Sequence, residues 1–153
     1  MPMRRSLRTP LLALFLVVTG ACRAPGGSSG ALPAPDAYRG ALVSSLQVEP
    51  GGDSVAFVLQ VTNPTEAPVR LHFPTGQSFD FTVSDGRTEL WRWSSDRSFT
   101  EALWTVTVAA GETRTYSASW RPAPALRGRR LSAVGRLTST DHPVVRTAEF
   151  ALP

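Results

Sequence analysis

The sequence predicts an all-β domain, an antiparallel immunoglobulin-like β-sandwich of about eight or nine short strands. Apolar and polar residues alternate over most of the chain from about residue 41 onward, and turn residues separate the alternating segments. No long segment repeats with the period of 3.6 residues that an amphipathic helix requires. The 153 residues, 42% of them hydrophobic, suffice for one domain with its own core. A small barrel is the alternative that this pattern leaves open.

The strands are identified by side chains that point alternately to two faces. In SVAFVLQV, residues 54–61, every second residue is Val, Phe or Leu on one face. The same alternation occurs in VRLHF (69–73), FDFTVSD (79–85), WTVTV (104–108) and ETRTYSASW (112–120), and more weakly in LSAVGRL (131–137) and VVRTAEFAL (144–152).

Asp85-Gly86 predicts a tight hairpin, because this dipeptide supplies the positive φ angles of a two-residue turn. Residues 79–84 and 88–93 should therefore pair. Strict alternation places Glu89, Trp91 and Trp93 on one face of the second strand. We expect at least one of these tryptophans to fill the space between two sheets.

Two further expectations concern the surroundings of this hairpin. Asp80 alternates with Phe79 and Phe81, so it should face away from the core as a surface or turn-bracing carboxylate that could pair with Arg92. SSDRSFTEAL, residues 94–103, breaks the alternation and predicts a loop or a single helical turn. Phe99 and Leu103 should fold back from it onto the domain.

The N-terminus predicts export. Residues 1–21 contain three arginines, an apolar run and then small residues, which is the layout of a secretory signal. The eleven residues between Pro10 and Cys22 are too few for a membrane-spanning helix, which needs roughly 20. VVTGAC resembles the lipobox of bacterial lipoproteins, which implies a lipidated Cys22. Residues 22–36, rich in Gly, Ser, Pro and Ala, predict a flexible tether, and residues 37–153 the folded domain.

This layout predicts an exported lipoprotein of the bacterial cell envelope, anchored in a membrane. By analogy with lipoprotein sorting, Arg23 rather than Asp after the cysteine permits passage to the outer membrane, facing the periplasm. Cys22 is the only cysteine, so no disulfide is expected. Removing Arg4, Arg5 and Arg8 with the signal leaves thirteen basic residues against twelve acidic ones. This near-neutral balance argues against nucleic-acid binding.

The residues needed for catalysis are scarce. The two histidines are His72, which points outward from a predicted strand, and His142, which lies in a turn beside Pro143. Neither accompanies a serine in a recognisable nucleophile motif. No spacing of His, Cys or carboxylates is typical of a metal site. We therefore expect no enzyme, no catalytic residues, no metal and no cofactor.

Residues 63–120 resemble the BsuPI-type intracellular proteinase inhibitor domain. The resemblance lies in the order and spacing of several short features: Asn63, Phe73, Gly76-Gln77, Phe79-Asp80-Phe81, Trp91-Arg92-Trp93, Phe99, Gly111-Glu112 and Trp120. The segment RPAPALRGRR, residues 121–130, departs from the short turn expected after Trp120. The predicted export signal also departs from an intracellular family.

The resemblance implies an immunoglobulin-like sandwich and inhibition of a serine proteinase. A rigid loop would then enter the proteinase cleft, with Trp93, Arg97 and Phe99 as candidate binding residues. The alternative is an envelope protein-protein interaction module without inhibitory activity, which binds a partner through loop contacts or by accepting a strand at a sheet edge.

Overall fold

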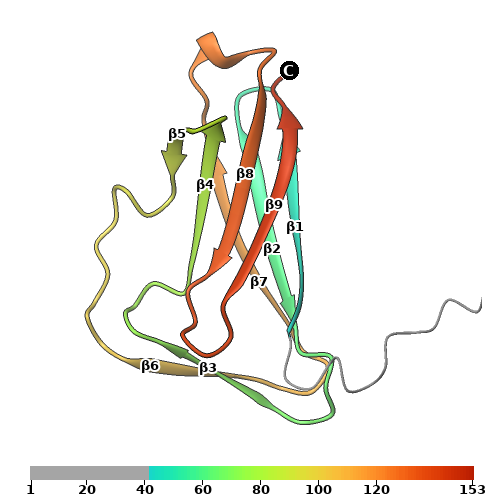
Figure 1. Ribbon diagram of the computed structural model, residues 1–153, viewed down its shortest axis with the longest axis vertical. Coiled ribbons are helices and arrows are strands. Elements are labelled where there is room, and N and C mark those ends of the chain that lie inside the picture. The colour runs from blue at the N-terminus through green and yellow to red at the C-terminus, as the bar shows by residue number, and fades with distance from the viewer. Residues whose placement is uncertain (1–41) are drawn as a thin grey trace, which may run out of the picture. The chain divides into compact units, whose positions relative to one another are not determined.

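The computed structural model describes residues 42–153, which form nine strands and one 3-10 turn at Pro124–Leu126 (Figure 1). The strands form a three-stranded sheet β1-β2-β7, a four-stranded sheet β5-β4-β8-β9 and a two-stranded ribbon β3-β6, with antiparallel pairing throughout. Their bounds are β1 (Val43–Pro50), β2 (Val55–Thr62), β3 (Val69–Phe73), β4 (Phe79–Asp85), β5 (Thr88–Arg92), β6 (Trp104–Val108), β7 (Thr113–Trp120), β8 (Arg130–Leu137) and β9 (Val144–Ala151).

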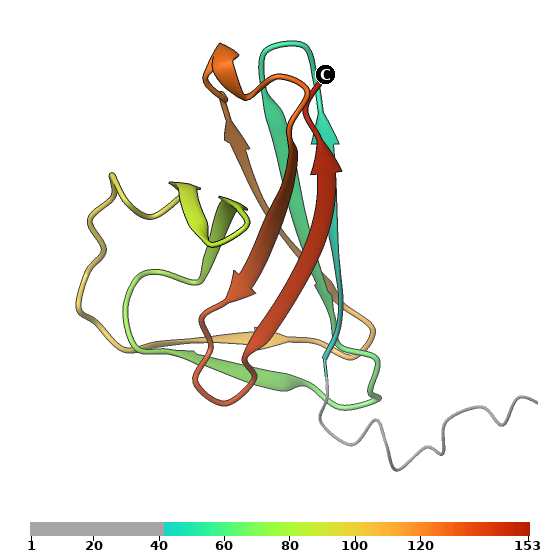
Figure 2. The same ribbon diagram turned by 45° about the horizontal axis from the view of Figure 1, so that its top comes forward.

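This arrangement confirms the predicted all-β antiparallel sandwich. The two larger sheets face each other, and β1 of one sheet runs beside β9 of the other in both views (Figures 1 and 2). Arg146 Nε on β9 donates to the Ser44 carbonyl on β1 over 3.0 Å, which links the two edges. The signal sequence at 1–21, the lipidated Cys22 and the tether at 22–36 lie outside the described residues and stay predictions, as does the domain boundary at residue 37.

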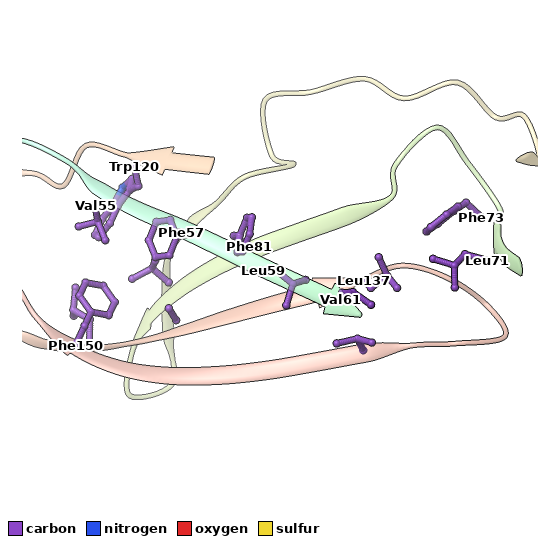
Figure 3. Packing of buried hydrophobic residues seen from close by; sticks show 14 of the residues in the cluster. Val55, Phe57, Leu59, Val61, Leu71, Phe73, Phe81, Trp120, Leu137 and Phe150 are labelled. Atoms are coloured by element: carbon purple, nitrogen blue, oxygen red, sulfur yellow. The ribbon is translucent and has the colours of Figure 1, made fainter. Parts of the chain in front are cut away.

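The core lies between the two larger sheets and extends to the β3-β6 ribbon (Figure 3). Every second side chain of β2 points into it, and Val55, Phe57, Leu59 and Val61 are all fully buried, as the alternation predicted. Phe57 stacks on Phe81 of the opposite sheet with ring centroids 5.7 Å apart. Burial of large apolar side chains on both sheets is therefore the main force that holds the layers together.

Asn63 joins the end of β2 to the neighbouring turns. Its side chain is fully buried, and its amide donates to the carbonyls of Ala67 (2.8 Å) and Val108 (3.1 Å). Its side-chain oxygen accepts from the backbone N–H of Thr65 over 3.0 Å. A buried amide needs such partners, so Asn63 ties the turn at 63–68 to the end of β6.

The β4-β5 hairpin forms as predicted, but its turn is shifted by one residue. Asp85 pairs with Thr88, so the two loop residues are Gly86 and Arg87. Gly86 has φ 57°, and no non-glycine residue in the described part of the chain has positive φ. A positive φ at the first loop position alone is typical of a type II′ turn, which places glycine there.

A β-bulge changes the faces of β5. Val83 pairs with Trp91, whereas the next residue, Ser84, pairs with Glu89, so Leu90 is an extra residue on β5. Trp91 follows Val83 toward the core, and Glu89 follows Ser84 to the outer face. The expectation that Glu89 shares a face with Trp91 is therefore wrong.

Candidate functional site

The candidate site is built around the segment that follows β5. Trp91 stacks between Phe57 and Trp120, with centroid distances of 5.4 and 6.0 Å. Trp93 stacks on Phe79 at 4.2 Å, and its backbone N–H donates to the Phe81 carbonyl over 2.9 Å. Both tryptophans therefore form the inner edge of the core, as expected for at least one of them.

Asp80 fixes this segment from the outer face of β4. Its carboxylate accepts hydrogen bonds from the backbone N–H groups of Phe81 (2.9 Å) and Ser94 (3.2 Å), and from the Ser94 hydroxyl (2.7 Å). Arg92 Nη1 donates to it over 3.2 Å, so the predicted pairing is confirmed. Of the two predicted roles, the surface one is wrong, because Asp80 is only 6% exposed, and the bracing one agrees with its bonds to Arg92 and Ser94.

Arg92 also binds Glu89 through Nε and Nη2, with N–O distances of 3.0 and 2.5 Å. The Glu89 hydrogen bond, followed by the one to Asp80, raises the pKa of the Arg92 guanidinium, although partial desolvation lowers it. The bulge makes this contact possible, since it brings Glu89 to the outer face. One guanidinium thus bridges two carboxylates and closes the end of β5.

The structure brings the three predicted binding residues, Trp93, Arg97 and Phe99, into one cluster. Arg97 Cζ lies 4.4 Å from the centroid of the Trp93 ring, and Arg97 Nε donates to the Trp93 carbonyl over 3.0 Å. The Phe99 ring lies 5.8 Å from that of Trp93. Arg97 and Phe99 both lie against Trp93, so they stiffen the start of the loop 93–103.

The second half of this loop is held beside the β3-β4 connection. The Gly76 N–H donates to the Thr100 carbonyl over 2.8 Å, and Trp104 Nε1 donates to the Thr75 carbonyl over 2.6 Å. A Cβ at position 76 would lie 2.7 Å from Thr100 Oγ1, so only glycine allows this close approach without a shift.

Between these two anchors the loop is fully presented to solvent. Glu101, Ala102 and Leu103 are exposed and belong to no strand or helix. Leu103 is 85% exposed, so the expectation that it folds back is wrong, whereas Phe99 does fold back. Sequence reasoning missed residues 101–103 as a presented segment, because their anchors, Gly76 and Thr75, lie more than twenty residues earlier.

A hollow of about 210 Å³ lies beside Leu103. It is lined by His72, Phe73, Pro74, Leu103, Trp104, Thr105 and Thr140.

His72, at the rim of this hollow, is bound to Asp141. The His72 Nδ1 lies 2.5 Å from Asp141 Oδ2, and the Ser139 hydroxyl donates to Asp141 Oδ1 over 2.6 Å. Desolvation raises the pKa of the Asp141 carboxyl, but the hydrogen bonds from Ser139 and His72 outweigh it and hold that pKa below its usual range. In a catalytic triad the hydroxyl contacts the imidazole, whereas here Ser139 contacts the acid. These three residues therefore brace the β8-β9 turn against β3.

A second hollow, of about 250 Å³, lies where the β7-β8 connection meets the β1-β2 turn. Arg121, Arg127 and Asp53 supply its charged groups. Within residues 42–153 no group of three or more His, Cys, Asp or Glu side chains could hold a metal ion. The same residues include no helix that is long and apolar enough to cross a membrane.

The comparison with protein families identifies the family of this domain. The family model of BsuPI, the intracellular proteinase inhibitor, matches residues 42–135. The chain belongs to this family. The matched range includes the whole candidate loop and every residue that supports it, and the BsuPI family implies a non-catalytic protein with an inhibitor-like function.

Other comparisons add little to the BsuPI assignment. No curated protein matches the chain. Among solved structures, the chain is similar to a β-glucosidase from Listeria innocua in complex with glucose, with 13% identity and a TM-score of 0.33. The similarity covers 73% of this chain but only 17% of that enzyme.

Proposed function

We propose that this chain is a non-catalytic inhibitor of a serine proteinase that acts in the bacterial cell envelope, where a lipid on Cys22 anchors it. The observation that carries the proposal is the BsuPI match over a domain whose longest described loop is held at both ends. Proteinase inhibitors bind tightly through interfaces of ordinary size, because their contact residues are already ordered before binding.

The loop is a better candidate than a sheet edge. Two arginine side chains occupy carbonyls that an added strand would need: Arg146 binds Ser44 on β1, and Arg114 Nη2 donates to Thr107 on β6 over 3.1 Å. Charged side chains at edges are a common protection against strand addition. These two contacts disfavour strand addition at β1 and at β6, and so support the loop as the binding element.

Inhibition is tested with the purified chain at micromolar concentration against trypsin-like, chymotrypsin-like and subtilisin-like serine proteinases. We expect competitive inhibition of at least one of them. Arg97→Ala combined with Phe99→Ala should abolish it, because both side chains leave the cluster on Trp93. Arg121→Ala combined with Arg127→Ala, in the β7-β8 connection, is the matched control and should inhibit normally. A wild-type chain that inhibits none of these proteinases contradicts the proposal.

The anchor is tested by mass spectrometry of the mature N-terminus from cells that express the full chain. Acylated Cys22 at the N-terminus, together with recovery in an outer-membrane fraction, is the expected result. Two or more acyl chains give stable anchoring, since each buried methylene contributes about 0.8 kcal/mol. Cys22→Ser should release the protein from the membrane. An intact N-terminus that still begins at Met1 contradicts both export and anchoring.

A further inference from the structure

We propose that Leu103 is the side chain that enters the primary specificity pocket of the target proteinase, and that this proteinase therefore cleaves after large apolar residues. The inference rests on the proposed function and adds the specificity class of the partner. It assigns the choice of target to Leu103 rather than to Arg97, one of the three candidate binding residues.

Leu103 differs from other exposed apolar residues in its setting as well as in its exposure. Its 85% exposure compares with 47% for Val43 and 45% for Val145, which lie within the β1 and β9 strands. A single exposed leucine is common on protein surfaces and needs no explanation by itself. Leu103, however, lies within a run of exposed residues from 100 to 105, in a loop that is fastened on each side.

The fastening points bracket Leu103 closely. On one side, the Thr100 carbonyl accepts from the Gly76 N–H over 2.8 Å. On the other, the Trp104 indole donates to the Thr75 carbonyl over 2.6 Å and stacks on Phe73 at 4.9 Å. The backbone of residues 101–103 therefore projects from a supported frame. Holding a contact segment in place before binding reduces the entropy lost on association.

Arg97 is held in a way that makes it a poor specificity residue. Its Nε donates to the Trp93 carbonyl over 3.0 Å, and its guanidinium lies on the Trp93 ring. Entry into a proteinase pocket would break both contacts. Leu103 has no such contacts to lose, because most of its side chain is already in solvent.

The chemistry of the side chain selects the class of proteinase. Trypsin-like enzymes carry an aspartate in the primary pocket, whereas chymotrypsin-like enzymes have a hydrophobic slot there. A leucine leaves the buried aspartate of the first class unpaired and fills the slot of the second. Subtilisin-like proteinases that prefer apolar residues fit the same description.

The test measures inhibition constants of the full chain against chymotrypsin-like, subtilisin-like and trypsin-like proteinases. The wild type should inhibit an apolar-cleaving proteinase and not trypsin. Leu103→Ala should weaken that inhibition by about 100-fold, the effect of a binding hot spot. Leu103→Arg should lose it and gain inhibition of trypsin. Val145→Ala removes an exposed apolar side chain from β9 and should change nothing.

The outcomes separate this inference from the proposed function. If the wild type inhibits an apolar-cleaving proteinase and Leu103→Ala weakens inhibition less than about 3-fold, only the role of Leu103 is overturned. The role of Leu103 is also overturned if the wild type inhibits trypsin alone, or if Arg97→Ala weakens inhibition more than Leu103→Ala does. If the wild type inhibits no proteinase, the proposed function falls and this inference falls with it. Unchanged urea midpoints of the variants exclude unfolding as the cause of a loss.

Discussion

Replacing Asp80 tests how the loop is attached to the sandwich. In Asp80→Ala, four donors lose their acceptor: the backbone N–H groups of Phe81 and Ser94, the Ser94 hydroxyl and Arg92. Removing one member of a buried ion pair costs about 3–5 kcal/mol. Arg92 is 40% exposed and keeps Glu89, so water compensates part of this loss. We therefore expect a decrease of about 2–4 kcal/mol in the free energy of unfolding.

Asp80→Asn separates charge from hydrogen bonding. The remaining side-chain oxygen can still accept from the backbone N–H groups of Phe81 and Ser94. The new amide takes the place of Oδ2, which accepts from both Arg92 and the Ser94 hydroxyl. Arg92 can only donate and loses its acceptor, whereas the Ser94 hydroxyl can turn and accept from the amide, so the main loss is the charged hydrogen bond. Since such bonds contribute about 1.5–3 kcal/mol when buried and less when exposed, we expect a loss of about 1–2 kcal/mol.

The assay is equilibrium unfolding in urea, followed by tryptophan fluorescence, with inhibition measured on the same samples. Asp80→Ala should also weaken inhibition under conditions where it is fully folded, because Ser94 no longer holds the start of the loop. Ser94→Ala should cost less in the Asp80→Ala background than in the wild type. Neutral surface substitutions change the free energy of unfolding by up to about 0.5 kcal/mol. If the free energy of unfolding of Asp80→Ala differs from that of the wild type by no more than this, the attachment through Asp80 is refuted.

Three further variants test the fold. Phe57→Ala leaves a cavity among stacked rings and should lower the free energy of unfolding by about 3–5 kcal/mol, and a loss below about 1 kcal/mol in urea would be inconsistent with its packing. Gly86→Ala should lower the free energy of unfolding in urea by about 1 kcal/mol, because alanine disfavours the positive φ at this position. Arg87→Ala, the control next to it, should change this free energy little. Asp141→Asn should lower the free energy of unfolding by at most about 1 kcal/mol at pH 7, because the His72–Asp141 pair is partly exposed to solvent. Because the pKa of Asp141 is lowered in the folded state, its contribution to the free energy of unfolding is present above about pH 4 and is lost below it. The free energies of unfolding of the wild type and the variant should therefore become equal in acid. A difference that stays constant with pH would argue against the bond between Asp141 and His72.

The sequence was most informative where burial alternates strictly. In β2 all four inward residues, from Val55 to Val61, are fully buried, because an internal strand has one face against the opposite sheet. The hairpin was also located correctly from Asp85-Gly86. The bulge at Leu90 was not predictable, since alternation alone carries no information about an inserted residue, and it reversed the face of Glu89.

Several contacts join segments that lie far apart in the sequence, and alternation along a strand does not predict them. Asp80 is on the outer face as predicted, yet it is buried, because the chain returns over it fourteen residues later at Ser94. His72 meets Asp141 sixty-nine residues further along the chain. Leu103 was expected to bury itself because it is apolar, but the anchors on either side hold its backbone away from the core. Local propensity cannot reveal any of these pairings.

The features by which the chain resembles the BsuPI family are largely those that support the loop. Gly76 binds the Thr100 backbone, Asp80 binds Ser94, and Phe79 and Phe99 pack on Trp93. These contacts fix where the loop starts and where it turns back, whatever side chains lie at its exposed positions. Leu103 lies outside this pattern. A frame specified by the family pattern, with a solvent-facing position left free, would let members of one fold inhibit proteinases of different specificity by changing that residue alone.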